Sequence, residues 1–101
     1  MDLNTARSSD FTSSIGTEFR TADESGGAIA LELVEATALP PQPGAPRPES
    51  FSLIFRGPQD RPLNQGVYPL EHDQLGSHEL FLVPIGPGSD GRGPYYQAIF
   101  N

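Results

Sequence analysis

The chain has 101 residues and a formal net charge of −7, from 13 acidic residues and six basic ones. All six bases are arginine, so a lysine Schiff base and a P-loop lysine are excluded. The chain has no cysteine, which excludes disulfides, thiolate metal ligands and a cysteine nucleophile. The acidic balance disfavours binding to nucleic acids and to anionic membranes, because both are negatively charged.

The sequence predicts a polar arm at residues 1–9, followed by a single β-domain at residues 10–101. The arm lacks the apolar core of a signal peptide, which predicts cytoplasmic synthesis and leaves open a place in an extracellular or particle-like assembly. A short helix is expected next, because Phe11 and Ile15 fall on one helical face and Ser9 or Asp10 can cap it. Gly16 favours its end.

Strands are expected in the rest of the chain, where runs with alternating side chains lie between turn-forming sequences. In the second run the alternation changes parity at Leu33 and Val34, which predicts a β-bulge. Pro69 cannot donate a ladder hydrogen bond, so its run is expected at a sheet edge or a bulge. The pattern predicts a mainly β fold, a small antiparallel sandwich or barrel of about six strands with one short N-terminal helix. The expected strands are residues 17–22, 28–38, 50–56, 67–72, 78–85 and 95–100.

The run at residues 78–85 is apolar on both faces, which is typical of a strand that lies centrally or contacts a partner. It is far too short to span a bilayer, so no membrane insertion is expected. Residues 40–49 are rich in proline and predict a stiff, extended loop. The side chains expected to be buried are Phe51, Leu53, Phe55, Leu80, Leu82 and Ile99.

Two histidines provide the best polar cluster, because His72 and His78 flank a short turn together with Glu71, Asp73 and Glu79. Such a set could bind zinc or perform acid–base chemistry. No third segment supplies further ligands or a nucleophile, so a solvent-exposed hairpin is the stronger interpretation. We therefore expect no catalytic residues, no metal site and no cofactor.

Interface residues are expected in three places: the arm, the proline-rich loop, and the paired tyrosines Tyr95 and Tyr96, which form an alternative platform for a ligand. The stiff loop loses less entropy on docking than a flexible one. The expected interface residues are Leu3, Arg7, Pro41, Pro43, Arg47, Tyr95 and Tyr96.

Several motifs resemble a family of short bacterial β-domain proteins of unknown function. They are a Phe–short helix–Gly–x–x–Phe start, F-S-L-x-F-R-G-P, and L-E-H followed by L-F-L-V-P-[IV]-G-P, with a final x-Y-x-A-x-F-N. The matching positions are Phe11, Gly16, Phe19, residues 51–58, 70–72 and 80–87, Tyr96, Ala98, Phe100 and Asn101. The resemblance implies a compact β-domain, an association with phage-tail-like or tail-fibre gene groups, and no catalytic residues.

Together these features predict a non-enzymatic structural protein, a self-assembling subunit of a filament or tail-like particle. Its partners are expected to be copies of itself or other structural proteins, without nucleic acid. A monomeric domain that binds a ligand or protein through Tyr95 and Tyr96 is the first alternative. A small enzyme that uses His72 and His78 is the second.

Overall fold

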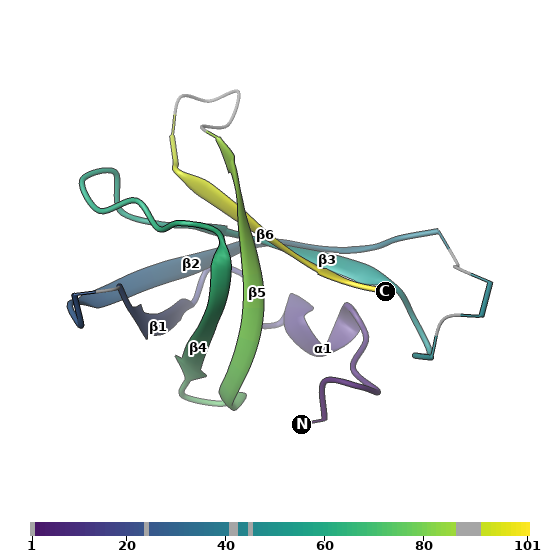
Figure 1. Ribbon diagram of the computed structural model, residues 1–101. Coiled ribbons are helices and arrows are strands. Elements are labelled where there is room, and N and C mark those ends of the chain that lie inside the picture. Colours follow the sequence, from purple (N-terminus) through teal and green to yellow (C-terminus); the bar gives the residue numbers. More distant parts are fainter. Residues whose placement is uncertain (1, 24, 41–42, 45, 87–91) are drawn as a thin grey trace.

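The computed structural model describes residues 2–23, 25–40, 43–44, 46–86 and 92–101. Six strands form a closed antiparallel barrel in the order β1-β2-β3-β6-β5-β4 (Figure 1). The mainly β prediction is therefore confirmed, as a barrel. No described helix is long and apolar enough to cross a membrane. The elements are α1 (Ser9–Thr12), β1 (Glu18–Ala22), β2 (Ala28–Ala38), β3 (Phe51–Arg56), β4 (Gly66–His72), β5 (Gly76–Gly86) and β6 (Tyr95–Phe100).

The predicted N-terminal helix is only one turn long. It ends at Thr12, and its N-cap residue Ser8 makes no side-chain capping bond, so capping by Ser9 or Asp10 was wrong. Asp10 instead accepts a hydrogen bond from the backbone N–H of Arg7, at 2.8 Å. Ile15 lies beyond the helix and is exposed. A helix this short depends on packing, which Phe11 alone provides.

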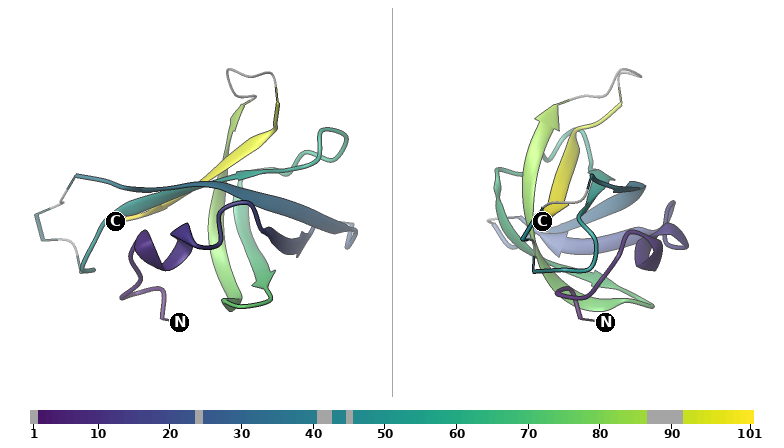
Figure 2. Two further views of the ribbon diagram at one scale, coloured as in Figure 1. Left: turned by 180° about the vertical axis from the view of Figure 1, so that it is seen from behind. Right: turned by 90° about the vertical axis from the view of Figure 1, so that its right-hand side faces the viewer.

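The predicted bulge in β2 is confirmed by a register shift between Leu33 and Glu35 in the pairing of β2 with β3. One extra residue bends a strand and increases its twist. Ahead of the bulge β2 pairs with β1, and beyond it β2 pairs with β3 alone. The strand thus passes from one neighbour to the next, and the strands curl round to enclose the core (Figure 2).

The barrel is closed by the contact between β1 and β4, which has the fewest paired residues of any strand contact described. β4 pairs with β5 along its whole length but with β1 at a single residue pair, Arg20 with Glu71. Pro69 lies outside that pairing, as expected for a residue that has no N–H to donate. The β1–β4 contact is therefore nearly an edge.

The core prediction is correct except at one position. Phe51, Leu53, Phe55, Leu80 and Leu82 are all buried. Ile99, in contrast, is 53% exposed, because β6 pairs with β3 in a register that turns its side chain outward. The inward side chains of β6 are Tyr96, Ala98 and Phe100.

The N-terminal segment packs on its own barrel. Phe11 is buried, with its ring 5.7 Å from that of Phe51 and 6.5 Å from that of Phe100, at the end of the barrel where β3 begins and β6 finishes (Figures 1 and 2). Ala6 is 1% exposed and Leu3 packs against the core. Ala6 therefore belongs to the core although it lies in the expected polar arm, because its small side chain gives little signal in the sequence.

Candidate interaction surface

The outer side of β5 carries a row of apolar side chains. Leu80 and Leu82 point into the core, so Phe81 and Val83 point outward by strand alternation, and Ile85 is exposed at the irregularity between Pro84 and Gly86 in the β5–β6 pairing. Phe81 pairs across the strands with Val67 of β4. Phe81, Ile85 and Val67 are each roughly half exposed, at 50%, 48% and 59%. We call the four residues Val67, Phe81, Val83 and Ile85 the β5 ridge.

The ridge holds most of the large apolar side chains that the described part of the chain exposes. Those exposed side chains are Ile15, Val67, Phe81, Ile85 and Ile99. Three of them belong to the ridge, and Ile99 lies on β6, the next strand. The sequence pattern predicted a central strand that is apolar on both faces, and β5 does lie between β4 and β6. Its exposed side is the one that a partner could cover.

The two ends of the ridge differ in charge. At the end where β5 begins, Glu79 is paired with Pro69, and Glu71 and Asp73 lie nearby with one base, Arg20, bonded to Asp73 at 2.8 Å. That end carries three carboxylates and one guanidinium.

The described residues at the far end of the ridge are less acidic. Tyr95 pairs with Gly86 on one side and with Arg56 on the other, and Arg56 forms an ion pair with Glu32. Arg92 is exposed close by in the chain. The ridge is therefore an apolar strip whose described neighbours are more acidic at one end than at the other.

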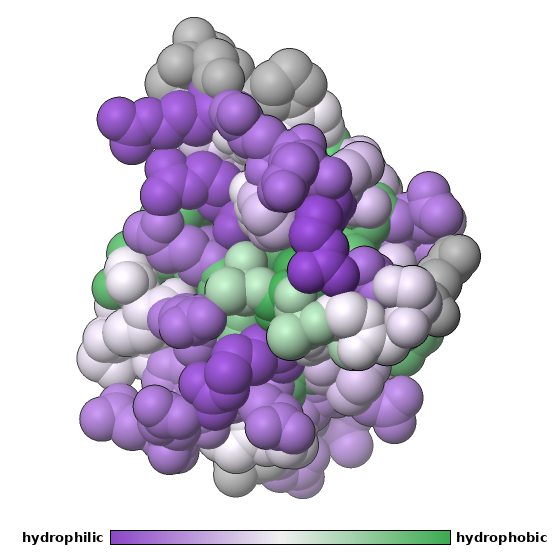
Figure 3. Space-filling view, turned by 90° about the vertical axis from the view of Figure 1, so that its left-hand side faces the viewer, coloured by the Kyte–Doolittle hydropathy of each residue, from purple (hydrophilic) through white to green (hydrophobic). Residues whose placement is uncertain are grey.

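The side of the barrel toward which the β1–β2 turn projects is different. It is mainly hydrophilic and shows only a small apolar area near its centre (Figure 3). Outward positions of β1 and β2 there are occupied by charged residues or alanine, such as Glu18, Arg20 and Ala30. Exposed large apolar residues thus avoid these two strands.

The two tyrosines expected to act together lie on opposite faces of β6. Tyr96 is completely buried, and its hydroxyl accepts a hydrogen bond from the backbone N–H of Leu63 at 2.7 Å. Tyr95 is only partly buried and points outward. Tyr96 therefore cannot present its side chain to a partner, which corrects the expected pair.

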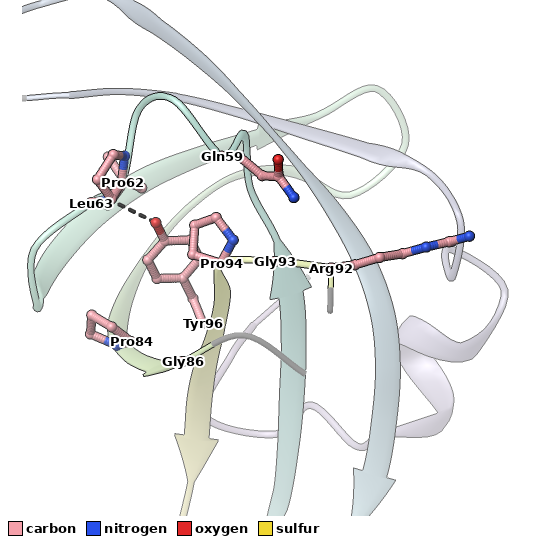
Figure 4. A pocket seen from close by; sticks show the side chains of 9 residues that line it. All are labelled: Gln59, Pro62, Leu63, Pro84, Gly86, Arg92, Gly93, Pro94 and Tyr96. Atoms are coloured by element: carbon pink, nitrogen blue, oxygen red, sulfur yellow. Dashed lines mark hydrogen bonds between the residues drawn. The ribbon is translucent and has the colours of Figure 1, made fainter. Parts of the chain in front are cut away.

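A hollow of about 340 Å³ lies beside Tyr96. Figure 4 shows Pro62, Pro84 and Pro94 around the tyrosine ring, whereas the side chain of Arg92 points away. The described lining is mainly apolar, which suits a small apolar group.

The histidines have structural partners in the hairpin. His72 is buried, and its Nδ1 accepts hydrogen bonds from the backbone N–H groups of Gln74 and Leu75, at 3.1 and 3.2 Å. Its Nε2 must then carry the proton and donate to Thr17 Oγ1, 2.8 Å away. His78 Nε2 lies 2.7 Å from the carbonyl oxygen of Leu75. Among the described residues, no three histidines, aspartates or glutamates are grouped so as to hold a metal ion.

The segment with Leu3 and Arg7 leads into α1, which lies at the end of the barrel where β6 finishes, whereas Tyr95 begins β6 (Figure 1). Leu3 packs against the core, whereas Arg7 and Pro43 are exposed. Pro41 falls outside the described residues. Arg47 is partly buried and lies over the rings of Phe51 and Phe100, 5.6 and 5.2 Å from their centres. Leu3, Arg7 and Arg47 are therefore not seen to form one surface with the tyrosines.

A family model described as a domain of unknown function (DUF6916) matches residues 6–100. The chain belongs to this family. Comparison with curated proteins gives no match, and comparison with solved structures gives none either. Membership of DUF6916 agrees with the expected family of unknown function, while the link to phage-tail-like gene groups stays a prediction.

The DUF6916 match begins at Ala6, the residue that anchors the N-terminal segment. A short contact holds this segment in place, because Glu49 Oε1 accepts hydrogen bonds from the backbone N–H and the hydroxyl of Ser8, at 2.8 and 2.7 Å. Arg47 also reaches the carbonyl oxygen of Ala6 at 3.5 Å. The end of the proline-rich loop therefore clasps the N-terminal segment onto the barrel.

This clasp predicts a pH dependence. The hydrogen bond from the Ser8 backbone N–H has the largest effect on Glu49 and the bond from the Ser8 hydroxyl the next. Both hold the pKa of Glu49 below its ordinary value of 4.5, with a smaller contribution from the charge of Arg7. A lowered folded-state pKa stabilises the clasp above pH 4.5, and that stabilisation is lost as the pH falls through the lowered value. In an NMR titration, we expect the Ser8 amide shift to change with a midpoint below 4.5.

The Glu49→Gln variant is the control, because its amide cannot titrate and the Ser8 transition should disappear. A midpoint at or above 4.5 in the wild-type protein would contradict the clasp.

Proposed function

We propose that this DUF6916 protein is a non-enzymatic assembly subunit that associates with copies of itself through the β5 ridge. The observation that carries this proposal is the exposure of Val67 and Phe81 side by side on neighbouring strands, with Ile85 exposed further along β5. Contiguous apolar patches on soluble proteins mark contact sites more often than isolated apolar residues do.

A second copy suits the ridge because it would cover apolar side chains with apolar side chains. Burial of a large apolar side chain contributes about 1.5–3 kcal/mol when it passes from full exposure to full burial, so half-exposed residues contribute about half of that. Stable interfaces bury about 800 Å² on each partner, which requires polar neighbours of the ridge as well. Those neighbours are acidic at one end only, so two ridges can meet without bringing their carboxylates together.

The hollow beside Tyr96 favours a second candidate function, the binding of a small apolar group. The ridge is preferred, because strand pairing places the exposed Val67 beside the exposed Phe81 and Val83 continues the outward row along β5.

Sedimentation equilibrium and native mass spectrometry test the proposal. We expect the wild-type protein to form a concentration-dependent oligomer in the micromolar range, typical of a small interface. A Phe81→Ser variant should keep its circular dichroism spectrum and weaken association at least about tenfold, since loss of about 1.4 kcal/mol of binding energy has that effect.

Ile15→Ser is the matched control, because Ile15 is also exposed but lies outside the strands. It should associate like the wild-type protein. A wild-type protein that stays monomeric at all concentrations would overturn the proposal and favour the ligand-binding alternative. Unchanged association of Phe81→Ser would show that another surface is used.

A further inference from the structure

We infer that two copies meet along the β5 ridge with their β5 strands antiparallel, around a two-fold axis perpendicular to the strand. This inference rests on the proposed function and specifies how the second copy is oriented.

The order of side chains along the ridge supports this orientation. The outward residues of β5 run from Ser77 and Glu79 through Phe81 to Val83, and Ile85 is exposed at the irregularity that follows. The carboxylates of Glu71, Asp73 and Glu79 all lie toward the first end. The other end has Tyr95 paired with Gly86 and with Arg56. One ridge therefore begins acidic and ends beside a phenol and the Arg56–Glu32 ion pair.

Two parallel ridges would bring the acidic ends together. The axis would then run along β5, and Glu79 of one copy would face Glu79 of the other. Like charges that face each other at an interface oppose association, and partial exclusion of water strengthens the repulsion. The antiparallel arrangement instead keeps the acidic ends apart, because each meets the partner's end with Tyr95, where Arg56 is already paired with Glu32.

Side-chain size gives a second reason. In the antiparallel arrangement the axis passes between Phe81 and Val83, so each phenylalanine faces a valine of the other copy. Large side chains opposite smaller ones interdigitate well. The arrangement is isologous and closes after two copies, so a filament would need a second contact surface elsewhere on the barrel.

The absence of cysteine makes this orientation measurable by cross-linking. Sheets packed face to face lie about 10 Å apart, and each residue advances a strand by about 3.3 Å. We would place single cysteines by Ser77→Cys, Val83→Cys and Ile85→Cys, and treat each dimer with a bismaleimide that has a two-carbon spacer. None of these substitutions removes Glu79, the charge on which the orientation depends.

We expect the Val83→Cys variant to cross-link, because Val83 lies next to the proposed axis in either orientation. An equal mixture of Ser77→Cys and Ile85→Cys proteins should cross-link at least several-fold more than either protein alone. Ser77 residues of an antiparallel pair would lie about 30 Å apart, beyond the spacer.

The outcomes separate the two proposals. Efficient cross-linking of Ser77→Cys with itself would show parallel ridges and overturn the orientation alone. Dimers in which Val83→Cys fails to cross-link would overturn the ridge as the interface, and with it the orientation. A wild-type protein that forms no dimer would overturn both.

Discussion

Phe55→Ala is expected to lower the free energy of unfolding by about 3–5 kcal/mol, the usual range for a buried phenylalanine. The Phe55 side chain is completely buried. Its ring meets that of Phe19 edge to face, with centres 5.2 Å apart, and so joins β3 to β1 across the barrel. Removal of the ring leaves a cavity in the centre of the core. Urea denaturation followed by circular dichroism measures the effect.

Phe81→Ala is the matched control, because Phe81 is the same residue type on a neighbouring part of the barrel but is half exposed. At a protein concentration low enough for monomers, it should lower the free energy of unfolding by less than about 1.5 kcal/mol, since only part of the ring leaves an apolar environment. Equal losses for the two variants would contradict the assignment of inward and outward faces.

The strands could be predicted from the sequence because their signals are local. Alternation identified the inward Phe51, Leu53 and Phe55 of β3, and a parity change identified the bulge near Leu33. Closure into a barrel had no such signal. It depends on the strand pairing of Arg20 in β1 with Glu71 in β4, and these residues lie far apart in the chain. Alternation does not reveal which strands become neighbours.

The error at Ile99 has a similar cause. β6 is apolar on both faces, with Tyr95 and Ile99 on one and Tyr96 and Phe100 on the other. Alternation alone could not decide which face turns inward, and the pairing of β6 with β3 settles it. The same register buries Tyr96 and removes it from the expected interface.

Only part of the β5 ridge could be predicted from the sequence. A strand that is apolar on both faces predicted a central position or a partner contact, and Phe81 and Ile85 fit that pattern. Val67 could not be added from the sequence, because its place beside Phe81 follows from the β4–β5 register. The whole surface could therefore be identified only from the tertiary structure, whereas the apolar character of β5 is apparent in the sequence.

His72→Phe is expected to lower the free energy of unfolding by about 2–3 kcal/mol, because partly buried groups left without a partner cost about 1–3 kcal/mol each. Phenylalanine preserves the ring contact with Phe19, whose centre lies 4.5 Å from that of the imidazole. It removes the acceptor for the N–H groups of Gln74 and Leu75 and the partner of Thr17 Oγ1. Thermal and urea denaturation measure the loss.

His78→Phe is the comparison that makes this result specific, because His78 belongs to the same hairpin but bonds one carbonyl oxygen, that of Leu75. Leu75 and His78 are both only partly buried, so we expect water to replace the imidazole and the loss to stay below about 1 kcal/mol. A His72→Phe protein as stable as the wild type would show that the ring is not needed to hold the turn. That result would favour the alternative in which the protein is a small enzyme that uses His72. A large loss confined to His72→Phe would instead identify this histidine as the residue that ties the β4–β5 turn to the segment before β1, through Thr17.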